Sequence, residues 1–322
     1  MGFDSVVDEI SKIGIVPVIA IEDAKDAVPL AKALIRGGLN CAEVTFRTAA
    51  AADAIANIVK EYPDMLVGAG TILNPEQADK AIEAGAKFIV SPGFNPKTVK
   101  HCIDRNIPII PGTSSPSDIE AALDMGLSVV KFFPAEPAGG LKMLKAMSAP
   151  YANVRFMPTG GINEDNLGEY LAFDKIVACG GSWMVKKDMI SAGEFDKIEE
   201  LTRQAVNKML DYEVLHVGIN MTDENAAAEV TKKFSSLFGQ GTREGDLSFF
   251  VGNLVEVMKL KYKGTMGHIA IGTNSIKRAM YQLERQGVKF DESTASYDAK
   301  GNLKVIYMEG EVGGFALHLT QK

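Results

Sequence analysis

The stretch Val129-Val130-Lys131-Phe132-Phe133-Pro134-Ala135-Glu136 places one lysine inside an apolar run that a proline closes. This pattern predicts a buried strand that ends near the proline. Burial disfavours a charged ammonium group. Lys131 therefore either extends past the strand end into solvent, or stays desolvated as a free amine that can attack a carbonyl carbon. The lysine alone favours the first interpretation, and the surrounding sequence has to decide between the two.

Short apolar segments recur roughly every 20–25 residues through the first two thirds of the chain. They predict strands at Ile15–Ala20, Cys41–Phe46, Met65–Ala69, Lys87–Ser91, Ile107–Ile110, Val129–Phe133, Val154–Met157 and Ile176–Cys179. Alanine-rich helices are predicted between strands, at Ala24–Arg36, Ala49–Tyr62, Pro75–Ala84 and Asp118–Met125. Eight strands joined by helical connections match the (β/α)8 TIM barrel, and an open doubly wound sheet is the alternative. In a barrel, the active site gathers at the carboxyl ends of the strands.

Several of these helices carry terminal signals. Asn74 precedes a proline and fits an N-cap, with Gln77 in the capping-box position. The pair Gly37-Gly38 and the single residues Gly85 and Gly126 each predict the end of a helix before the next strand.

The composition limits the classes of function. The 322 residues allow one large domain or two, and 46% hydrophobic with 23% charged residues is typical of a globular protein in water. A net charge of −7 without a long basic run argues against a nucleic-acid or anionic-membrane surface. The N-terminus lacks a signal-peptide pattern, and no apolar run is long enough to cross a bilayer. Three scattered cysteines fit a reducing environment, so we expect a cytoplasmic protein.

Polar side chains mark one face of the second predicted strand. Glu43, Thr45 and Arg47 share that face by strand alternation. They form either an internal ion pair between Glu43 and Arg47, or an acid–base carboxylate beside a guanidinium that grips a substrate carboxylate. Alternation also predicts that Lys131 and Phe133 point together into the barrel.

Two glycine pairs end the last two predicted strands, Gly160-Gly161 and Gly180-Gly181. Glycine lets backbone N–H groups approach an anion closely, and the loops after strands seven and eight of barrels often hold a phosphate. The alternative is two ordinary tight turns. Two pairs in these positions favour a phosphorylated substrate.

Residues 1 to about 208 closely resemble 2-keto-3-deoxy-6-phosphogluconate (KDPG) aldolase, also described as 4-hydroxy-2-oxoglutarate (KHG) aldolase. The stretches that carry the resemblance, in order, are Gly14–Ile19, Glu43–Thr48, Val67–Pro75, Ser91–Gly93, Lys131–Glu136, Pro158–Ile162 and Gly180–Trp183. The resemblance implies a homotrimer of (β/α)8 barrels with class I chemistry that needs no metal or other cofactor.

The resemblance assigns roles by position. It implies that Lys131 forms the Schiff base and that Glu43 is the general acid–base group. Arg47 and Thr71 match positions that hold the pyruvyl carboxylate. Other matching positions line the pocket or the phosphate site, namely Pro92, Phe133, Thr159, Gly160, Gly161, Gly181 and Ser182.

We therefore expect retro-aldol cleavage of KDPG to pyruvate and glyceraldehyde 3-phosphate, with KHG cleavage to pyruvate and glyoxylate as a further activity. The 6-phosphogalactonate epimer is the alternative substrate, because the two differ at one carbon that no residue here distinguishes. A phosphosugar isomerase on the same fold is the competing function, and it would form no imine on Lys131.

In the last third of the chain the alanine-rich helical segments stop, and phenylalanine, glycine and histidine become more frequent. This part contains three of the four histidines, His216, His268 and His318. Its two halves look alike, each predicted as strand, helix and three strands. One half starts near Leu215 and the other near Gly267. The sequence therefore predicts a first domain over 1–210 and an α+β domain of two βαβββ modules over 211–322.

This part resembles the vicinal oxygen chelate family, which includes glyoxalase I. His216, Glu256 and His268 fall on three of that family's four metal-ligand positions. The fourth should be a glutamate near Leu317, and the sequence has none there. His318 is one residue further, on the opposite face unless a bulge intervenes. The alternatives are Glu309 and Glu311, which precede the position.

Two histidines and a carboxylate suit Fe(II), Mn, Ni or Zn, whereas a degenerate module would bind no metal. Three interpretations of the whole chain remain. In the first, an aldolase is joined to a second, metal-dependent enzyme, which is a lyase, isomerase or dioxygenase. In the second, the aldolase is joined to a binding or oligomerisation module, and in the third the barrel is only a scaffold and the C-terminal domain carries the activity.

Overall fold

A computed structural model describes residues 2–322, and these divide into two compact units. The first unit extends to Met209, and the second is Leu210–Lys322. No helix within residues 2–322 is long and apolar enough to span a membrane. Each unit is described below by itself.

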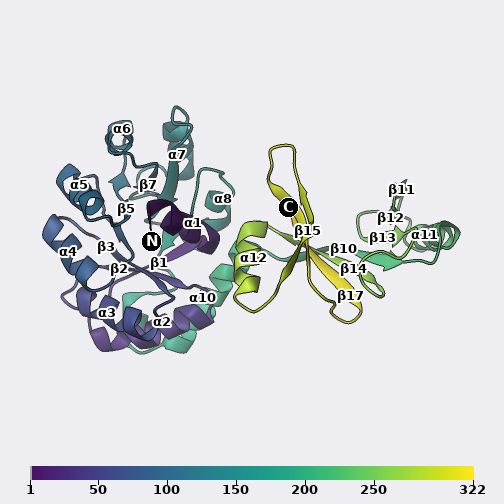
Figure 1. Cartoon of the computed structure of the whole chain (residues 1–322), viewed down its shortest axis with the longest axis horizontal. Coiled ribbons are helices and arrows are strands. Elements are labelled where there is room, and N and C mark those ends of the chain that lie inside the picture. Colours follow the sequence, from purple (N-terminus) through teal and green to yellow (C-terminus); the bar gives the residue numbers. More distant parts are fainter. Residues whose placement is uncertain (1) are drawn as a thin grey trace. The chain divides into compact units, whose positions relative to one another are not determined.

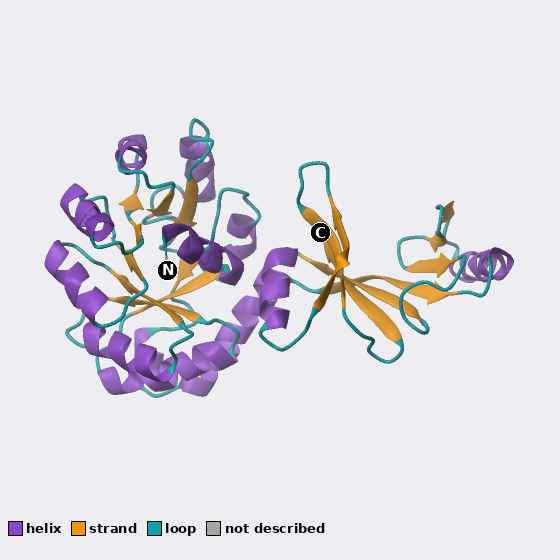
Figure 2. Cartoon of the chain, viewed as in Figure 1, coloured by secondary structure: helices purple, strands orange, loops and turns teal. Residues whose placement is uncertain are grey.

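The first unit alternates parallel strands with helices, which lie around the outside of the strands (Figures 1 and 2). Its strands are β1 (Ile15–Ile19), β2 (Cys41–Thr45), β3 (Leu66–Gly70), β4 (Phe88–Val90), β5 (Ile109–Ile110), β6 (Gly112–Thr113), β7 (Val129–Phe132), β8 (Arg155–Pro158) and β9 (Cys179–Gly181). Its helices are α1 (Phe3–Ile13), α2 (Ala27–Arg36), α3 (Ala51–Glu61), α4 (Pro75–Glu83), α5 (Pro96–Asp104), α6 (Pro116–Asp124), α7 (Gly140–Ser148), α8 (Leu167–Leu171), α9 (Lys187–Ser191) and α10 (Phe195–Leu210), with a 3-10 turn at Ala24–Asp26.

The strand order makes the unit TIM-barrel-like. One sheet has the order β5-β4-β3-β2-β1-β9 and a second has the order β6-β7-β8. The first and last strands pair, and a bridge between Thr159 and Gly180 connects the end of β8 to β9. An open doubly wound sheet would leave its first and last strands unpaired with each other, so that alternative is wrong.

Two predicted strands differ in detail from the observed ones. The fifth is divided at Pro111, which has no N–H for the ladder, although its carbonyl accepts a hydrogen bond from the backbone N–H of Lys131 at 2.8 Å. The eighth starts later than predicted, because Ile176 makes one isolated bridge to Phe156 and the regular strand begins at Cys179. Helix α1 was not predicted.

The N-cap at Asn74 and the glycine ends of the helices are confirmed, whereas the capping box at Gln77 is wrong. Asn74 Oδ1 accepts from the backbone N–H of Gln77 at 2.9 Å, and Gln77 Oε1 accepts from the N–H of Leu73 rather than from that of Asn74. Gly85 and Gly126 follow their helices with φ of 96° and 79°, which is the left-handed region that favours glycine.

The second unit is one eight-stranded sheet with two helices. Its elements are β10 (Glu213–Asn220), α11 (Glu224–Phe238), β11 (Thr242–Glu244), β12 (Ser248–Val251), β13 (Val255–Met258), β14 (Gly267–Thr273), α12 (Ile276–Glu284), β15 (Phe290–Tyr297), β16 (Leu303–Met308) and β17 (Phe315–Gln321). The sheet order is β11-β12-β13-β10-β14-β17-β16-β15. Strands β10 and β14 pair antiparallel at the centre, and each runs parallel to the last strand of its own half. Both halves therefore have the order strand, helix and three strands.

Candidate active site

Lys131 on β7 and Glu43 on β2 form a buried ion pair. Lys131 Nζ lies 3.1 Å from Glu43 Oε1, and the two residues are 5% and 0% exposed. Two buried charges are stable in contact but costly apart, since removing one leaves the other desolvated without compensation. The lysine does not extend into solvent, so the first interpretation of Lys131 is wrong.

A glycine opposite Glu43 makes room for its carboxylate. Gly70 ends β3, and a Cβ there would lie 2.2 Å from Glu43 Oε1. Among the described residues, Glu43 Oε2 has no hydrogen-bond partner although it is buried. One carboxylate oxygen therefore binds the lysine, and the other remains available to exchange protons with a bound substrate.

The Gly70→Ala variant is expected to lower kcat of the lysine-dependent reaction by roughly 100-fold, because the new methyl group displaces the carboxylate of Glu43, which we predict to be the acid–base group. Gly168→Ala is the matched control, since a Cβ at Gly168 meets nothing within 4 Å. Steady-state kinetics and a melting curve for both variants check the prediction. An unchanged kcat in Gly70→Ala would show that the position of Glu43 does not limit the reaction.

Arg47 lies in the turn after β2 and contacts Thr71 rather than Glu43. Its Nε donates to Thr71 Oγ1 at 3.3 Å, and no ion pair between Arg47 and Glu43 occurs in residues 2–322. The alternative of an internal Glu43–Arg47 pair is therefore wrong. Thr71 has φ of 57°, a strained conformation for a β-branched residue. Thr45, from the same face, donates to the Ile19 carbonyl at 2.8 Å and is satisfied within the fold.

Phe133 lies beside the lysine, as alternation predicts. Lys131 Nζ is 5.4 Å from the centroid of the Phe133 ring. Pro92 is related to Lys131 through Gly112. Gly112 pairs with Lys131 across β6 and β7, and a Cβ on Gly112 would lie 2.1 Å from the Pro92 carbonyl oxygen.

A cavity of about 680 Å³ lies over the ends of β1, β2, β7, β8 and β9. Seven predicted site residues line it: Arg47, Phe133, Thr159, Gly160, Gly161, Gly181 and Ser182. Lys131, Glu43, Thr71 and Pro92 are not in this lining, and Phe133 and Arg47 connect the two groups. Thr159 Oγ1 is buried without a partner in the described part of the chain, so it can bind a ligand atom.

Residues 186–188 also line this cavity, and they were not predicted as site residues. Lys187 is ion-paired with Glu22 at 2.6 Å. The adjacent pair Lys186-Lys187 begins four residues after Ser182, and this pair was the signal in the sequence that could have predicted them.

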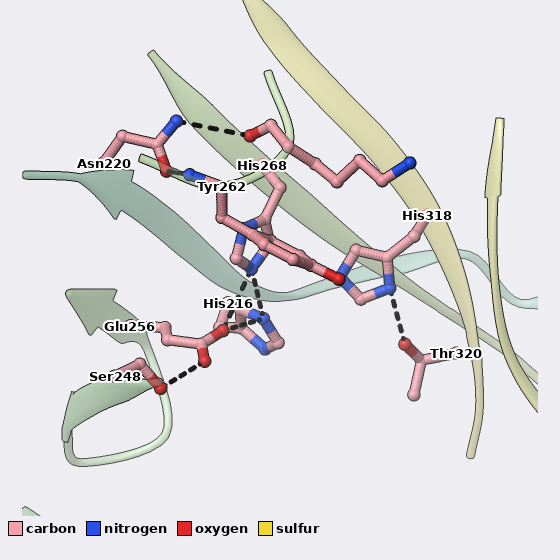
Figure 3. A network of polar contacts seen from close by, with 9 residues as sticks. His216, Asn220, Ser248, Glu256, Tyr262, His268, His318 and Thr320 are labelled. Atoms are coloured by element: carbon pink, nitrogen blue, oxygen red, sulfur yellow. Dashed lines mark hydrogen bonds and ion pairs between the residues drawn. The ribbon is translucent and has the colours of Figure 1, made fainter. Parts of the chain in front are cut away.

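The second unit brings three histidines and one glutamate together (Figure 3). One nitrogen from each of His216, His268 and His318 lies within 4.8 Å of the others. His268 Nε2 is 3.2 Å from His216 Nε2 and 3.0 Å from Glu256 Oε2, and Glu256 Oε2 is 3.2 Å from His216 Nε2. The three predicted ligands therefore meet, together with a fourth side chain.

The strand register explains why His318 joins the cluster. His216 pairs with Ala270, and Ala270 pairs with His318 in an uninterrupted β14–β17 ladder. Paired residues point to one face, and His268 shares it because it lies two residues before Ala270. The expectation that His318 points to the other face is wrong. That expectation placed the fourth ligand at Leu317, whereas the ladder places it one residue later, at His318.

The alternative carboxylates lie elsewhere. Glu309 and Glu311 are exposed beyond the end of β16, and Glu311 accepts a hydrogen bond from Thr265 at 3.2 Å. Glu256, by contrast, pairs with Gly218, two residues after His216, and so lies on the face of the histidines.

The electrostatics of the cluster favour a neutral His318 imidazole and an ionised Glu256 carboxylate. Burial alone would raise the pKa of Glu256, but hydrogen bonds from His216, His268 and Ser248 outweigh it and hold that pKa well below its usual range. Burial, together with repulsion from His268 and His216, lowers the pKa of His318 to about 3. Neutral nitrogen and anionic oxygen donors are the forms that bind a divalent transition metal.

Comparison with known proteins identifies the family of the first unit. The family model for KDPG and KHG aldolase matches residues 6–201. The chain is 52% identical to 2-dehydro-3-deoxy-phosphogluconate aldolase of Treponema pallidum, over 63% of this chain and 96% of that protein. It is 48% identical to KHG/KDPG aldolase of Escherichia coli, over 60% and 90%.

A solved structure agrees with this. KDPG aldolase of Legionella pneumophila, with pyruvate captured as a covalent carbinolamine, superimposes with a TM-score of 0.60 at 40% identity, covering 62% of this chain and 97% of that one. The family match covers more than half of the chain. The protein therefore belongs to the KDPG and KHG aldolase family of class I carbon–carbon lyases.

Proposed function

We propose that Lys131 attacks the ketone of KDPG and that the resulting imine drives cleavage to pyruvate and glyceraldehyde 3-phosphate. The observation that carries this proposal is the buried contact between Lys131 Nζ and Glu43 Oε1 at 3.1 Å. Lysine must lose a proton before it attacks, and the adjacent carboxylate is the group that can take it.

The same two residues serve each later step. Glu43 returns the proton so that the carbinolamine loses water and becomes a protonated imine. Glu43 then removes the proton of the C4 hydroxyl, the C3–C4 bond breaks, and its electron pair enters the imine to give an enamine. Protonation of the enamine carbon and hydrolysis release pyruvate and regenerate the Lys131 amine. The buried, unpartnered Oε2 of Glu43 supports this repeated proton traffic.

We assign the two charged ends of the substrate to separate binding sites. We assign the pyruvyl carboxylate to Arg47 and Thr71, whose contact at 3.3 Å aims both groups at one place. We assign the phosphate to Ser182 and the backbone of Gly160, Gly161 and Gly181, which line the cavity. Pro92, Phe133 and Thr159 would enclose the carbon chain between them.

KHG is a second candidate substrate, because its reacting carbons are the same and a carboxylate on C4 replaces the phosphate-bearing part of KDPG. The 6-phosphogalactonate epimer is the alternative to KDPG. Comparing kcat/KM for the two epimers and KHG ranks them, and we expect KDPG to be highest. We also infer that the protein is cytoplasmic and that its closed barrels form a homotrimer. Light scattering of the purified protein would test the trimer through its molecular mass.

The histidine cluster supports a second proposal, that the last third is a vicinal oxygen chelate domain with a divalent metal site. His216, Glu256 and His268 would hold the metal, with His318 in the fourth position. Such a metal would supply Lewis-acid chemistry toward substrate oxygens. The four side chains would fix its position and, with three neutral imidazoles and one carboxylate, leave a single negative charge on the protein side.

Purified full-length protein is expected to bind about one Zn²⁺, Mn²⁺, Ni²⁺ or Fe²⁺ per chain. Joint replacement of His216 and His268 by alanine should weaken binding at least about 100-fold, since two of four donors are lost. The His101→Ala variant is the control, because His101 contacts Asp79 in the first unit. Elemental analysis and metal titration check this. If the parent protein takes up no metal, the C-terminal domain is a degenerate module that binds none.

The same variants separate the three interpretations of the chain. An aldolase with a second enzyme, or with a binding module, predicts that the parent cleaves KDPG and that loss of the metal leaves this activity unchanged. A barrel kept as scaffold predicts no cleavage by the parent. A metal-dependent turnover of oxo acids that survives Lys131→Met would favour two enzymes in one chain.

A further inference from the structure

The segment after β7 is hydrogen-bonded to the loop after β8. The backbone N–H of Ala135 donates to the Thr159 carbonyl at 2.8 Å, and that of Glu136 donates to the Gly160 carbonyl at 2.9 Å. The chain that carries the reactive lysine and the loop assigned to the phosphate are therefore one continuous piece of hydrogen-bonded structure.

Glu136 occupies the space above Gly161. A Cβ on Gly161 would lie 2.5 Å from the Cβ of Glu136 and 2.6 Å from its Cγ. Gly160 and Gly161 have φ of 99° and 86°, in the region where glycine alone is unstrained. Such residues have the largest conformational freedom to lose, so the loop needs an external contact to hold one conformation.

The carboxylate of Glu136 is itself held by Tyr170 on α8. Tyr170 is 1% exposed, and its hydroxyl donates to Glu136 Oε1 at 2.5 Å. Burial and the neighbouring Glu136 raise the pKa of Tyr170, so its hydroxyl keeps the proton that it donates. No lysine, arginine or histidine pairs with Glu136 in the described residues, and Tyr170 is the partner that fixes it.

We propose that the Tyr170–Glu136 hydrogen bond positions the Gly160–Gly161 loop for the phosphate of the substrate. Neither residue is in the cavity lining. Tyr170 holds the Glu136 carboxylate, the stem of Glu136 packs on Gly161, and the Glu136 N–H binds the Gly160 carbonyl. Backbone N–H groups bind an anion well when they are fixed in advance, which is what this chain of contacts provides. The inference rests on the proposed phosphate-binding site.

Replacing Tyr170 by phenylalanine is expected to raise KM for KDPG roughly tenfold, the effect of losing one hydrogen bond to a charged group. Glu136→Ala should have a similar effect, and the double variant should be no worse than either single variant. Glu136→Gln should stay near the parent value, because its amide oxygen still accepts from the Tyr170 hydroxyl. Tyr151→Phe is the matched control, since Tyr151 donates to Glu120 in an exposed pair at 3.0 Å.

Borohydride trapping of pyruvate on Lys131 supplies a readout that does not involve the phosphate. It should be unchanged in all four single variants, and kcat at saturating KDPG should change little. A parent that traps no pyruvate would refute the proposed aldolase rather than this inference. Unchanged KM in Tyr170→Phe, equal losses in Glu136→Gln and Glu136→Ala, or a parallel loss of pyruvate trapping would each overturn the positioning role.

Discussion

Lys131→Met is expected to lower kcat for KDPG cleavage by about 10⁴-fold or more, which is the scale seen when a covalent nucleophile is removed. Methionine has a similar volume and no amine, so it cannot form the imine that accepts electrons from the breaking C3–C4 bond. Lys145→Met is the matched control. Lys145 Nζ lies 5.5 Å from the Phe173 ring centroid, much as Lys131 lies against Phe133, but away from Glu43.

Loss of Lys131 also leaves Glu43 buried without its ionic partner. Breaking one side of a buried pair costs about 3–5 kcal/mol of unfolding free energy. The double variant Lys131→Met, Glu43→Gln removes both charges and should recover most of that stability without recovering activity. Denaturant unfolding of the two variants, beside their kinetics, thus separates a chemical loss from a folding loss. Activity that returned with stability would argue against a covalent role for Lys131.

Glu43→Gln is expected to reduce kcat by roughly 10²–10⁴-fold, the range for a positioned acid–base group. The amide oxygen can still accept a hydrogen bond from Lys131 Nζ, but the amide cannot take up and return protons. Pyruvate should still form an imine on Lys131, more slowly than in the parent. Stopped-flow or quenched measurements of adduct formation would show this difference.

The matched control is Glu256→Gln, which replaces a partly buried, ion-paired carboxylate of the second unit and should leave KDPG cleavage unchanged. If Glu43→Gln retained kcat within tenfold of the parent, another group would have to move the protons. The Thr159 hydroxyl, which lines the cavity and has no hydrogen-bond partner among the described residues, would then be the first alternative to test.

Much of the first site could be predicted because its residues stand at strand ends with strong local signals. Glu43 and Lys131 are costly residues in apolar strands, and alternation correctly places Phe133 beside the lysine. That Glu43 pairs with Lys131 rather than with Arg47 depends on a contact across 88 residues of sequence. No periodicity contains that information.

The features that escaped prediction depend on register or on distant packing. His318 was misplaced because a one-residue error in the assumed ligand position inverts the face of a strand. Pro111 divides a strand because of one missing N–H, which an apolar pattern does not reveal. The contact between Tyr170 and Glu136 joins a short helix to a loop 34 residues earlier, so neither residue carries a signal of its own.

Borohydride reduction of the full-length protein in the presence of pyruvate, followed by peptide mass mapping, tests the Schiff-base chemistry most directly. We predict one reduced pyruvate adduct per chain, located on Lys131, and none on Lys131→Met. The chain offers many exposed lysines as internal controls, and these should remain unmodified. An adduct on another lysine, or no adduct under conditions in which KDPG is cleaved, would contradict the proposed mechanism.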